Sequence, residues 1–470
     1  MVSATEPPAT ELETFLPQDG SAIKDGALTG KYKVQVVPAR DVEATGQTGD
    51  KGFDPFKERD NPNPTTNCDT LTHLLKACLG TGMLSMPFAF KSAGLVLGIF
   101  LTIFVGFICT YCAYVYIECA HKLYQRTRKS TMSFPEVAQC AFTNGPPWAR
   151  PYAKTVRVII DLSLFVSYFG TCTVYSVIIA QNINQVIAVH MGEGLAERGM
   201  IAILLVPFVL LSWVPNLKYL APVSMVANAF MVVGLGITFY YFVMNMHPPS
   251  EVHMVTETVS TLPAFFSISI FAIEAIGVVM PLENNMKTPQ QFIGICGVMN
   301  QGMSAVTLIY IVIGFMGYAA YRDGTKENII TNLNPEDILA QVVKVLIALA
   351  VYCTFGLQFY VCLEIAWNSI KERFLKKPQI ANYLLRTGLA MAAVLVAVAV
   401  PKIMPFVGLI GALCFSILGL IMPPIVELIV RWDEGFGRGY WLIVKTILVA
   451  SFGLVVLLFG TYTAILDIFK

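Results

Sequence analysis

Charged side chains are scarce in this chain. Lys, Arg, Asp and Glu make up 13% of the 470 residues, about half the fraction of an ordinary soluble domain, whereas hydrophobic residues make up 55%. The formal net charge is only +1, and no concentrated basic surface stands out. Nucleic acid is therefore not an expected partner. Water is not the main solvent of such a chain, and a lipid bilayer is the expected surrounding.

The sequence also lacks the signatures of catalysis. We find no metal-ligand spacing, no phosphate-binding glycine loop and no nucleophile elbow, so we expect neither an enzyme nor a metal site nor an organic cofactor. The eleven cysteines do not form a disulfide framework, because most of them lie inside apolar runs as small packing residues.

The first 65 residues lack the apolar core of a signal peptide and are rich in Pro, Gly, Thr and acidic residues. This composition is typical of a disordered segment. We expect residues 1–65 to form a cytoplasmic tail, open to cytoplasmic signalling partners, and residues 66–470 to form the transmembrane domain.

Apolar stretches long enough to cross a bilayer recur along the rest of the chain. They predict an all-α polytopic membrane protein with about eleven spans. The expected spans are 71–93, 95–119, 156–189, 199–214, 217–244, 262–281, 292–320, 337–366, 383–400, 404–430 and 441–466. If the N-terminus is cytoplasmic, the inside loops hold seventeen Lys and Arg, whereas the outside loops and the C-terminus hold six. This bias predicts a cytoplasmic N-terminus and an extracellular or lumenal C-terminus.

The first and sixth spans contain breaks. Leu79-Gly80-Thr81-Gly82 interrupts the first span and is followed by Pro87, and 271–277 is followed by Pro281 in the sixth. Broken helices offset by five spans predict an inverted repeat of five plus five helices. Unwound backbone can bind the carboxylate and ammonium groups of an amino acid. The alternative at each break is a glycine that only lets two helices approach closely.

Two titratable residues stand out in these broken spans. Glu274 lies at the sixth break, where a carboxylate is costly and seldom kept without a role; the alternative is a structural pair or a hydrogen bond that locks the helix. His73 lies two helical turns before Gly80 on the same face and titrates near neutral pH; the alternative is an interfacial residue beside Lys76. We expect His73 and Glu274 to couple protons to transport.

The remaining candidate residues fall into two groups. The unwound backbone and a pocket wall give the expected substrate-binding residues, which are Gly80, Thr81, Gly82, Phe271, Ala272, Ile273, Glu274 and Phe355. Four further carboxylates are candidate gate or ion-pair residues, namely Asp161, Glu283, Glu364 and Glu427. For Glu283 a gate and a solvated helix end both remain open. For the other three an ion pair is favoured, with Lys76 and Lys344 as candidate partners.

The run from His73 to Gly94, HLLKACLGTGMLSMPFAFKSAG, resembles the first helix of the proton-coupled amino acid transporters of the amino acid/auxin permease group. The resemblance extends over roughly residues 65–466. It continues in Ile160-Asp161, in 272–277, in 280–286, in 357–361 with Glu364, and in 421–427. It implies a LeuT-like fold, alternating access, and proton-driven transport of small neutral amino acids such as alanine, glycine or proline. It also implies that His73 takes part in proton coupling, and it places the protein in the plasma membrane or an endolysosomal membrane.

Two departures limit what the resemblance implies. The outside loops near 190–198, 245–261 and 321–335 contain no cysteine and no Asn-X-Ser/Thr sequon, so neither a lumenal disulfide nor glycosylation is expected there. Two other functions also remain open. One is a sodium-coupled transporter that uses Thr354 and nearby hydroxyls, and the other is an amino-acid receptor that signals through its tail and moves little substrate.

Overall fold

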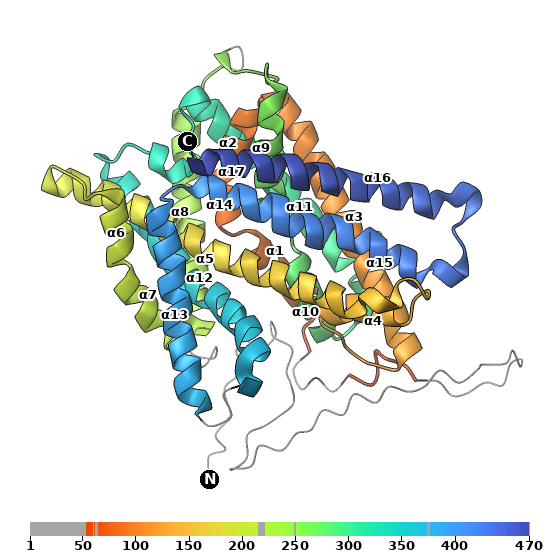
Figure 1. Cartoon of the computed structure of the whole chain (residues 1–470). Helices are drawn as coiled ribbons and strands as arrows, with labels where there is room; N and C mark the ends of the chain where they lie inside the picture. The colour runs from red at the N-terminus through yellow and green to blue at the C-terminus, as the bar shows by residue number, and fades with distance from the viewer. Residues whose placement is uncertain are drawn as a thin grey trace, which may run out of the picture.

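The computed structural model describes residues 53–59, 61, 64–214, 221–248, 251–373 and 377–469. Most of the expected tail 1–65 and the start of the expected span 217–244 lie outside these residues. The described chain is helical almost throughout (Figure 1). Its α-helices are α1 (Asn67–Cys78), α2 (Met86–Ala93), α3 (Leu95–Thr127), α4 (Phe134–Thr143), α5 (Ala153–Met191), α6 (Glu197–Ile203), α7 (Leu205–Ser212), α8 (Ala221–Met244), α9 (Leu262–Ile273), α10 (Ile276–Asn285), α11 (Val298–Tyr321), α12 (Ile338–Ile370), α13 (Pro378–Ala399), α14 (Ile403–Leu409), α15 (Met422–Val430), α16 (Trp441–Val455) and α17 (Thr461–Phe469).

Nine helices of the described chain are long and apolar enough to cross a membrane. The other two expected spans are the first, which is divided between α1 and α2, and the fourth, which is made of the short helices α6 and α7. Large apolar side chains such as Phe100 and Phe107 of α3 remain well exposed, 65% and 69%, on the outside of the bundle. Such a surface is stable against lipid rather than water. The all-α polytopic prediction is confirmed.

The first break lies between α1 and α2, where the backbone leaves the α-helical conformation. Leu79 leaves the helical region with φ −76° and ψ 59°, and a 3-10 turn, η1 (Thr81–Ser85), leads into α2. Pro87 lies in the first turn of α2, where its missing N–H costs nothing. The second break lies between α9 and α10. There Glu274 is extended, with φ −66° and ψ 123°.

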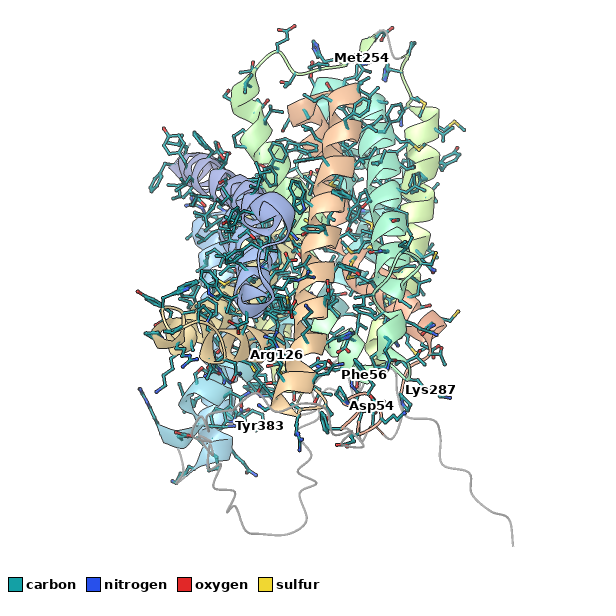
Figure 2. All side chains as sticks on the ribbon, turned by 90° about the vertical axis from the view of Figure 1, so that its right-hand side faces the viewer. Asp54, Phe56, Arg126, Met254, Lys287 and Tyr383 are labelled. Carbon is teal, nitrogen blue, oxygen red and sulfur yellow. The ribbon has the colours of Figure 1, made fainter. Side chains whose placement is uncertain are left out.

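The two broken helices lie antiparallel. At one end Thr65 N–H donates to Asn285 O and Lys287 N–H donates to Thr65 O, both at 2.9 Å. At the other end Leu95 N–H donates to the carbonyl of His253 at 2.9 Å. The start of the first broken helix therefore lies beside the end of the second, as an inverted repeat requires. Figure 2 places Met254 and Lys287 at opposite ends of the molecule, which we name the outer and inner ends after the predicted orientation.

A third irregular helix packs against the second break. Between α14 and α15 the backbone forms a π-helix, η10 (Ile410–Ile421), and η10 packs against α9. Two glycines allow this approach. A Cβ added at Gly411 would lie 2.0 Å from the carbonyl oxygen of Ser267, and one added at Gly419 would lie 2.0 Å from Oε2 of Glu274. π-Helical turns inside α-helices are frequent at functional sites.

Candidate functional site

The two breaks touch each other in the middle of the bundle. A Cβ added at Gly82 would lie 2.8 Å from Cα of Ala272, so only glycine permits this approach of the two backbones. Tyr310 of α11 lies across the contact. Its hydroxyl contacts the carbonyl of Cys78, where α1 ends, and the carbonyl of Ala272 at 3.0 Å. A single hydroxyl hydrogen serves one carbonyl at a time, so Tyr310 links the two breaks through one shared proton.

The carboxylate of Glu274 lies at the start of α10. Its Oε1 accepts a hydrogen bond from Ile276 N–H at 2.9 Å, and the positive end of the helix dipole favours a negative charge at this position. The other oxygen, Oε2, is inaccessible and accepts no hydrogen bond from an N–H or O–H group in the described structure. It faces Gly419 of η10, and the only donor beside the carboxylate among the described residues, apart from the backbone, is the weak thiol donor of Cys109 on α3. A carboxylate with one unmatched oxygen can accept a proton or the ammonium group of a ligand.

Apart from Phe355, the other expected substrate-binding residues lie around this carboxylate or at the first break. Thr81 is buried beside Tyr175 of α5, which also lies beside Gln358 of α12. A Cβ at Gly80 would meet no atom within 4 Å, so there is open space beside its backbone. Phe271 packs against Phe415 of η10, with ring centroids 6.2 Å apart. The breaks are thus enclosed by α3, α5, α11 and η10.

Phe355 lies in a different environment. Its ring is fully buried and stacks on Phe208 of α7, with centroids 4.1 Å apart, and on Phe359 one turn later. These contacts are typical of helix packing between α12 and α7. Ile273 is also fully buried, at the end of α9 directly before the second break.

His73 is buried, with 6% of its surface exposed, in the middle of α1. The neighbouring Leu74 packs so closely against α11 that a Cβ at Gly302 would lie 2.5 Å from it. The side chain of His73 therefore lies inside the bundle and not on its surface.

Two of the other carboxylates, Asp161 and Glu427, form ion pairs away from the breaks. Asp161 contacts Arg157 one turn earlier, at 3.7 Å on a half-exposed surface. The buried Glu427 of α15 accepts a hydrogen bond from Lys445 of α16 at 2.8 Å, and Glu364 is partly buried on α12. Within the described part of the chain, Lys344 does not pair with a carboxylate as the sequence suggested. Its fully buried ammonium donates instead to backbone carbonyls.

Those carbonyls belong to a short helical turn at the outer end, η8 (Ile329–Asn332), and the residue after it. Lys344 Nζ donates to Ile330 O at 3.0 Å and to Leu333 O at 2.8 Å. The η8 turn packs against η1 at the first break and thus covers it from the outside. A buried ammonium with several carbonyl partners holds such a turn firmly, because leaving those groups unpaired is costly.

Glu283 of α10 is fully buried at the inner end, so it is not a solvated helix end. Its Oε1 lies 2.7 Å from Arg59 and 2.8 Å from Nε2 of His121. Sequence reasoning missed Arg59, Tyr310 and Gly419. Each of them acts through a partner that lies far away in the chain, and no local pattern marks them.

The sequence model of the family described as "Transmembrane amino acid transporter protein" matches residues 63–466. The chain belongs to this family. As a family member it is an amino acid transporter and an integral membrane protein, and not an enzyme. The chain is 57% identical over 98% of its length to the Drosophila melanogaster "Proton-coupled amino acid transporter-like protein pathetic", of which it covers 95%.

More distant comparisons agree with the family. The chain is 24% identical over 87% of its length to a Caenorhabditis elegans protein named a probable amino acid transporter, skat-1, covering 91% of that protein. Among solved structures, the nucleobase-cation-symport-1 family transporter Mhp1 in a closed conformation matches with a TM-score of 0.51 and 14% identity. The match covers 88% of this chain and 92% of that one, and it shows a shared fold.

Proposed function

We propose that this amino acid transporter moves small neutral amino acids together with protons by alternating access, from the outside or a lumen into the cytoplasm. The proposal places the protein in the plasma membrane or an endolysosomal membrane, with the inner end in the cytoplasm. The name of the Drosophila relative supports a proton as the coupling ion.

The observation that carries the proposal is the unmatched Oε2 of Glu274 at a helix break. A carboxyl group in the middle of an apolar bundle is costly and marks ion or proton pathways. A zwitterionic substrate has no net charge, so the proton supplies the current. When Glu274 holds a proton, the site loses a charge that otherwise makes the crossing costly, and the loaded transporter can change its conformation.

The crowding of the site supports small substrates. The backbones of the two breaks lie so close at Gly82 and Ala272 that not even a methyl group fits between them. Tyr168 of α5 crowds the start of α10, because a Cβ at Gly277 would lie 2.9 Å from its hydroxyl. Open space remains beside Gly80. An alanine or glycine molecule fits such a site better than a substrate with a long side chain.

The test is uptake of radiolabelled alanine into proteoliposomes under an imposed pH gradient, without sodium, together with the current. We expect inward current and accumulation that rise as the outside pH falls from about 7.5 to about 5.5, the range in which a histidine titrates. Glu274→Gln keeps the acceptor for Ile276 N–H but cannot exchange a proton, and it should abolish accumulation driven by pH. The control is Glu336→Gln, an exposed carboxylate in the loop before α12.

The alternatives give different results in the same experiment. A sodium-coupled transporter would accumulate alanine only when sodium is present and would stop when choline replaces it. An amino-acid receptor would bind about one alanine per protein and accumulate none. Electroneutral uptake would also contradict proton coupling, while leaving the amino-acid site in place.

A further inference from the structure

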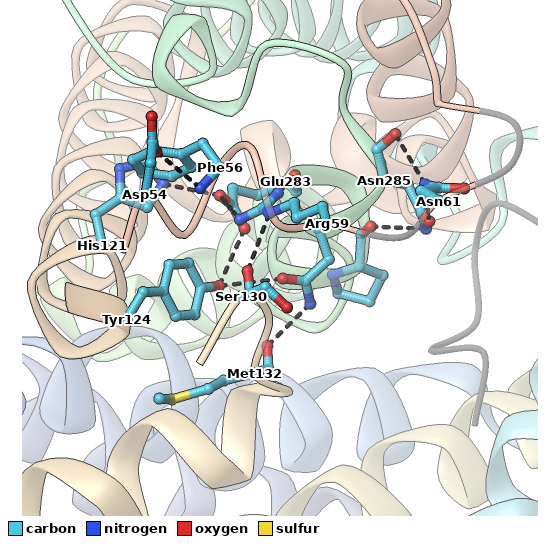
Figure 3. A network of polar contacts seen from close by, with 12 residues as sticks. Asp54, Phe56, Arg59, Asn61, His121, Tyr124, Ser130, Met132, Glu283 and Asn285 are labelled. Atoms are coloured by element: carbon cyan, nitrogen blue, oxygen red, sulfur yellow. Dashed lines mark hydrogen bonds and ion pairs between the residues drawn. The ribbon is translucent and has the colours of Figure 1, made fainter. Parts of the chain in front are cut away.

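One arginine from the segment before α1 reaches into the inner end of the bundle. Arg59 Nη2 donates to Glu283 Oε1 at 2.7 Å, Nη1 donates to Glu283 O at 2.8 Å, and Nε donates to Ser130 O at 3.0 Å. Only 5% of its side chain is exposed, and that of Glu283 is fully buried. The guanidinium therefore connects the segment before α1 with α10 and with the loop after α3 (Figure 3).

Aromatic rings and further polar contacts enclose this ion pair. The guanidinium carbon lies 5.5 Å from the ring centroids of both Phe56 and Tyr124. Tyr124 also donates to Glu283 Oε2 at 3.1 Å, and His121 contacts Oε1 at 2.8 Å. Phe56 packs edge-on against His121, with centroids 5.0 Å apart. Both oxygens of Glu283 are thus matched, in contrast with those of Glu274 nine residues earlier on the same broken helix.

The same segment is attached to the end of α10 along its length. Asn61 Nδ2 donates to Asn285 Oδ1 at 3.1 Å, and Thr65 hydrogen-bonds the backbone on both sides of Met286. α10 begins beside Glu274 and ends at these contacts. A movement of α10 away from α3 at the inner end must therefore separate Arg59 from at least one of its partners, because Arg59 holds α10 and the loop after α3 together.

We propose that Arg59 closes the inner end of the transporter, and that the segment formed by residues 53–59, 61 and 64–66 is a latch that must leave Glu283 before the substrate reaches the cytoplasm. A buried ion pair with all its hydrogen bonds made is costly to break on one side only, by about 3–5 kcal/mol. The inner end therefore opens when the latch moves as a unit. This inference rests on alternating access but not on the identity of the coupling ion.

The first test locks the latch with a reversible cross-link. In the double variant Asn61→Cys/Asn285→Cys, a short bis-methanethiosulfonate reagent, which spans more than a disulfide does, should join the latch to the end of α10 and stop alanine counterflow, and a reductant should restore it. The assay uses equal pH and equal salt on both sides, so a failure of proton coupling leaves it readable. The single variants Asn61→Cys and Asn285→Cys, treated with the same reagent, control for the eleven native cysteines. If the two cysteines do not cross-link, or if the cross-linked protein exchanges alanine at the rate of the reduced protein, the latch is refuted.

The second test weakens the latch. Arg59→Gln should shift the protein toward its inner-open state, and the apparent KM for alanine supplied from the outside should rise several-fold, because fewer molecules expose the outer site. Glu283→Gln should have the same effect, and the double variant should be no worse than either single one. The matched control is Lys57→Gln, because Lys57 is largely exposed and pairs only with Asp54 on the surface, at 3.4 Å. An unchanged KM in Arg59→Gln, or additive effects in the double variant, would overturn the proposal.

Discussion

Gly419 and Glu274 lie so close together that any side chain at position 419 would occupy the space of the carboxylate. The added Cβ would lie 2.0 Å from Oε2 and 2.6 Å from the carboxyl carbon. The carboxylate is thus placed by a residue that has no side chain and lies on a different helix. The position of the unmatched oxygen of Glu274 therefore depends on glycine at position 419.

We expect Gly419→Ala to displace the Glu274 carboxylate and to lower alanine transport by at least about tenfold, which corresponds to about 1.4 kcal/mol. Overpacking of this kind commonly costs about 1–3 kcal/mol. The measurement is initial uptake per correctly inserted protein. Gly388→Ala is the control, because a Cβ at this position of α13 meets no atom within 4 Å. Equal uptake by the two variants would separate Gly419 from the site.

Two neighbouring glycines of the first break should respond differently to alanine. Gly82→Ala must push Cβ against Ala272, whereas Gly80→Ala meets open space. We expect Gly82→Ala to lower the thermal unfolding temperature of the detergent-solubilised protein and to abolish alanine binding, at a cost of about 1–3 kcal/mol. Gly80→Ala should retain the unfolding temperature of the wild type. A reversed order would mean that the two breaks do not meet at Gly82.

Tyr310→Phe tests the link between the breaks. The variant removes the hydroxyl that contacts Cys78 O and Ala272 O, and the ring remains in place. A buried hydrogen bond contributes about 0.5–1.5 kcal/mol net, so we expect a modest loss of stability but a clear loss of transport, because two unwound segments lose their common partner. Hydrogen exchange at residues 79–82 should accelerate. Tyr462→Phe, at an exposed position of α17, should leave both measurements unchanged.

The outer end contains a carboxylate that should make stability depend on pH. Glu327 Oε2 accepts hydrogen bonds from the N–H groups of Ile403 and Met404. Burial raises the pKa of the Glu327 carboxyl above its ordinary value, although these N–H groups and the nearby Lys402 act in the opposite direction. The folded protein therefore holds this proton more tightly than the unfolded chain does.

It follows that the contribution of Glu327 to stability decreases as the pH rises from about 4.5, the ordinary pKa of the group, through the raised value. We expect thermal unfolding measured between about pH 4 and pH 7 to show this slope in the wild type. In Glu327→Gln the slope should be smaller. Glu257→Gln, an exposed carboxylate of the loop before α9, is the control. A steeper slope in Glu327→Gln would mean that folding lowers the pKa of this carboxyl instead of raising it.

The sequence predicted the features that depend on local chemistry. The glycines and prolines of the first and sixth spans located both breaks, because these residues weaken a helix and occur at a similar offset in two spans that are five apart. Glu274 could be predicted because a carboxylate inside an apolar span is visible in the sequence alone, without knowledge of the residues that contact it. The fourth span was also found, although it is divided between α6 and α7.

The features that depend on distant contacts were not predictable. Arg59 and Glu283 are 224 residues apart, and Tyr310 and Cys78 are 232 residues apart. The expected tail 1–65 included Arg59 because its composition is polar, yet Arg59 and its neighbours pack against α3 and α10. Phe355 was predicted as part of a pocket wall because aromatic residues recur along the eighth span, and the sequence could not show that its ring stacks on Phe208 of another helix.

The π-helix η10 sets the angle between two glycine contacts with the second broken helix. Near its start Gly411 approaches the carbonyl oxygen of Ser267, and near its end Gly419 faces Glu274. Each residue of a helix adds a fixed rotation about the axis, so deleting one residue from 412–418 would turn one of the two glycines away from its contact. The length of this stretch is therefore constrained as strictly as its composition.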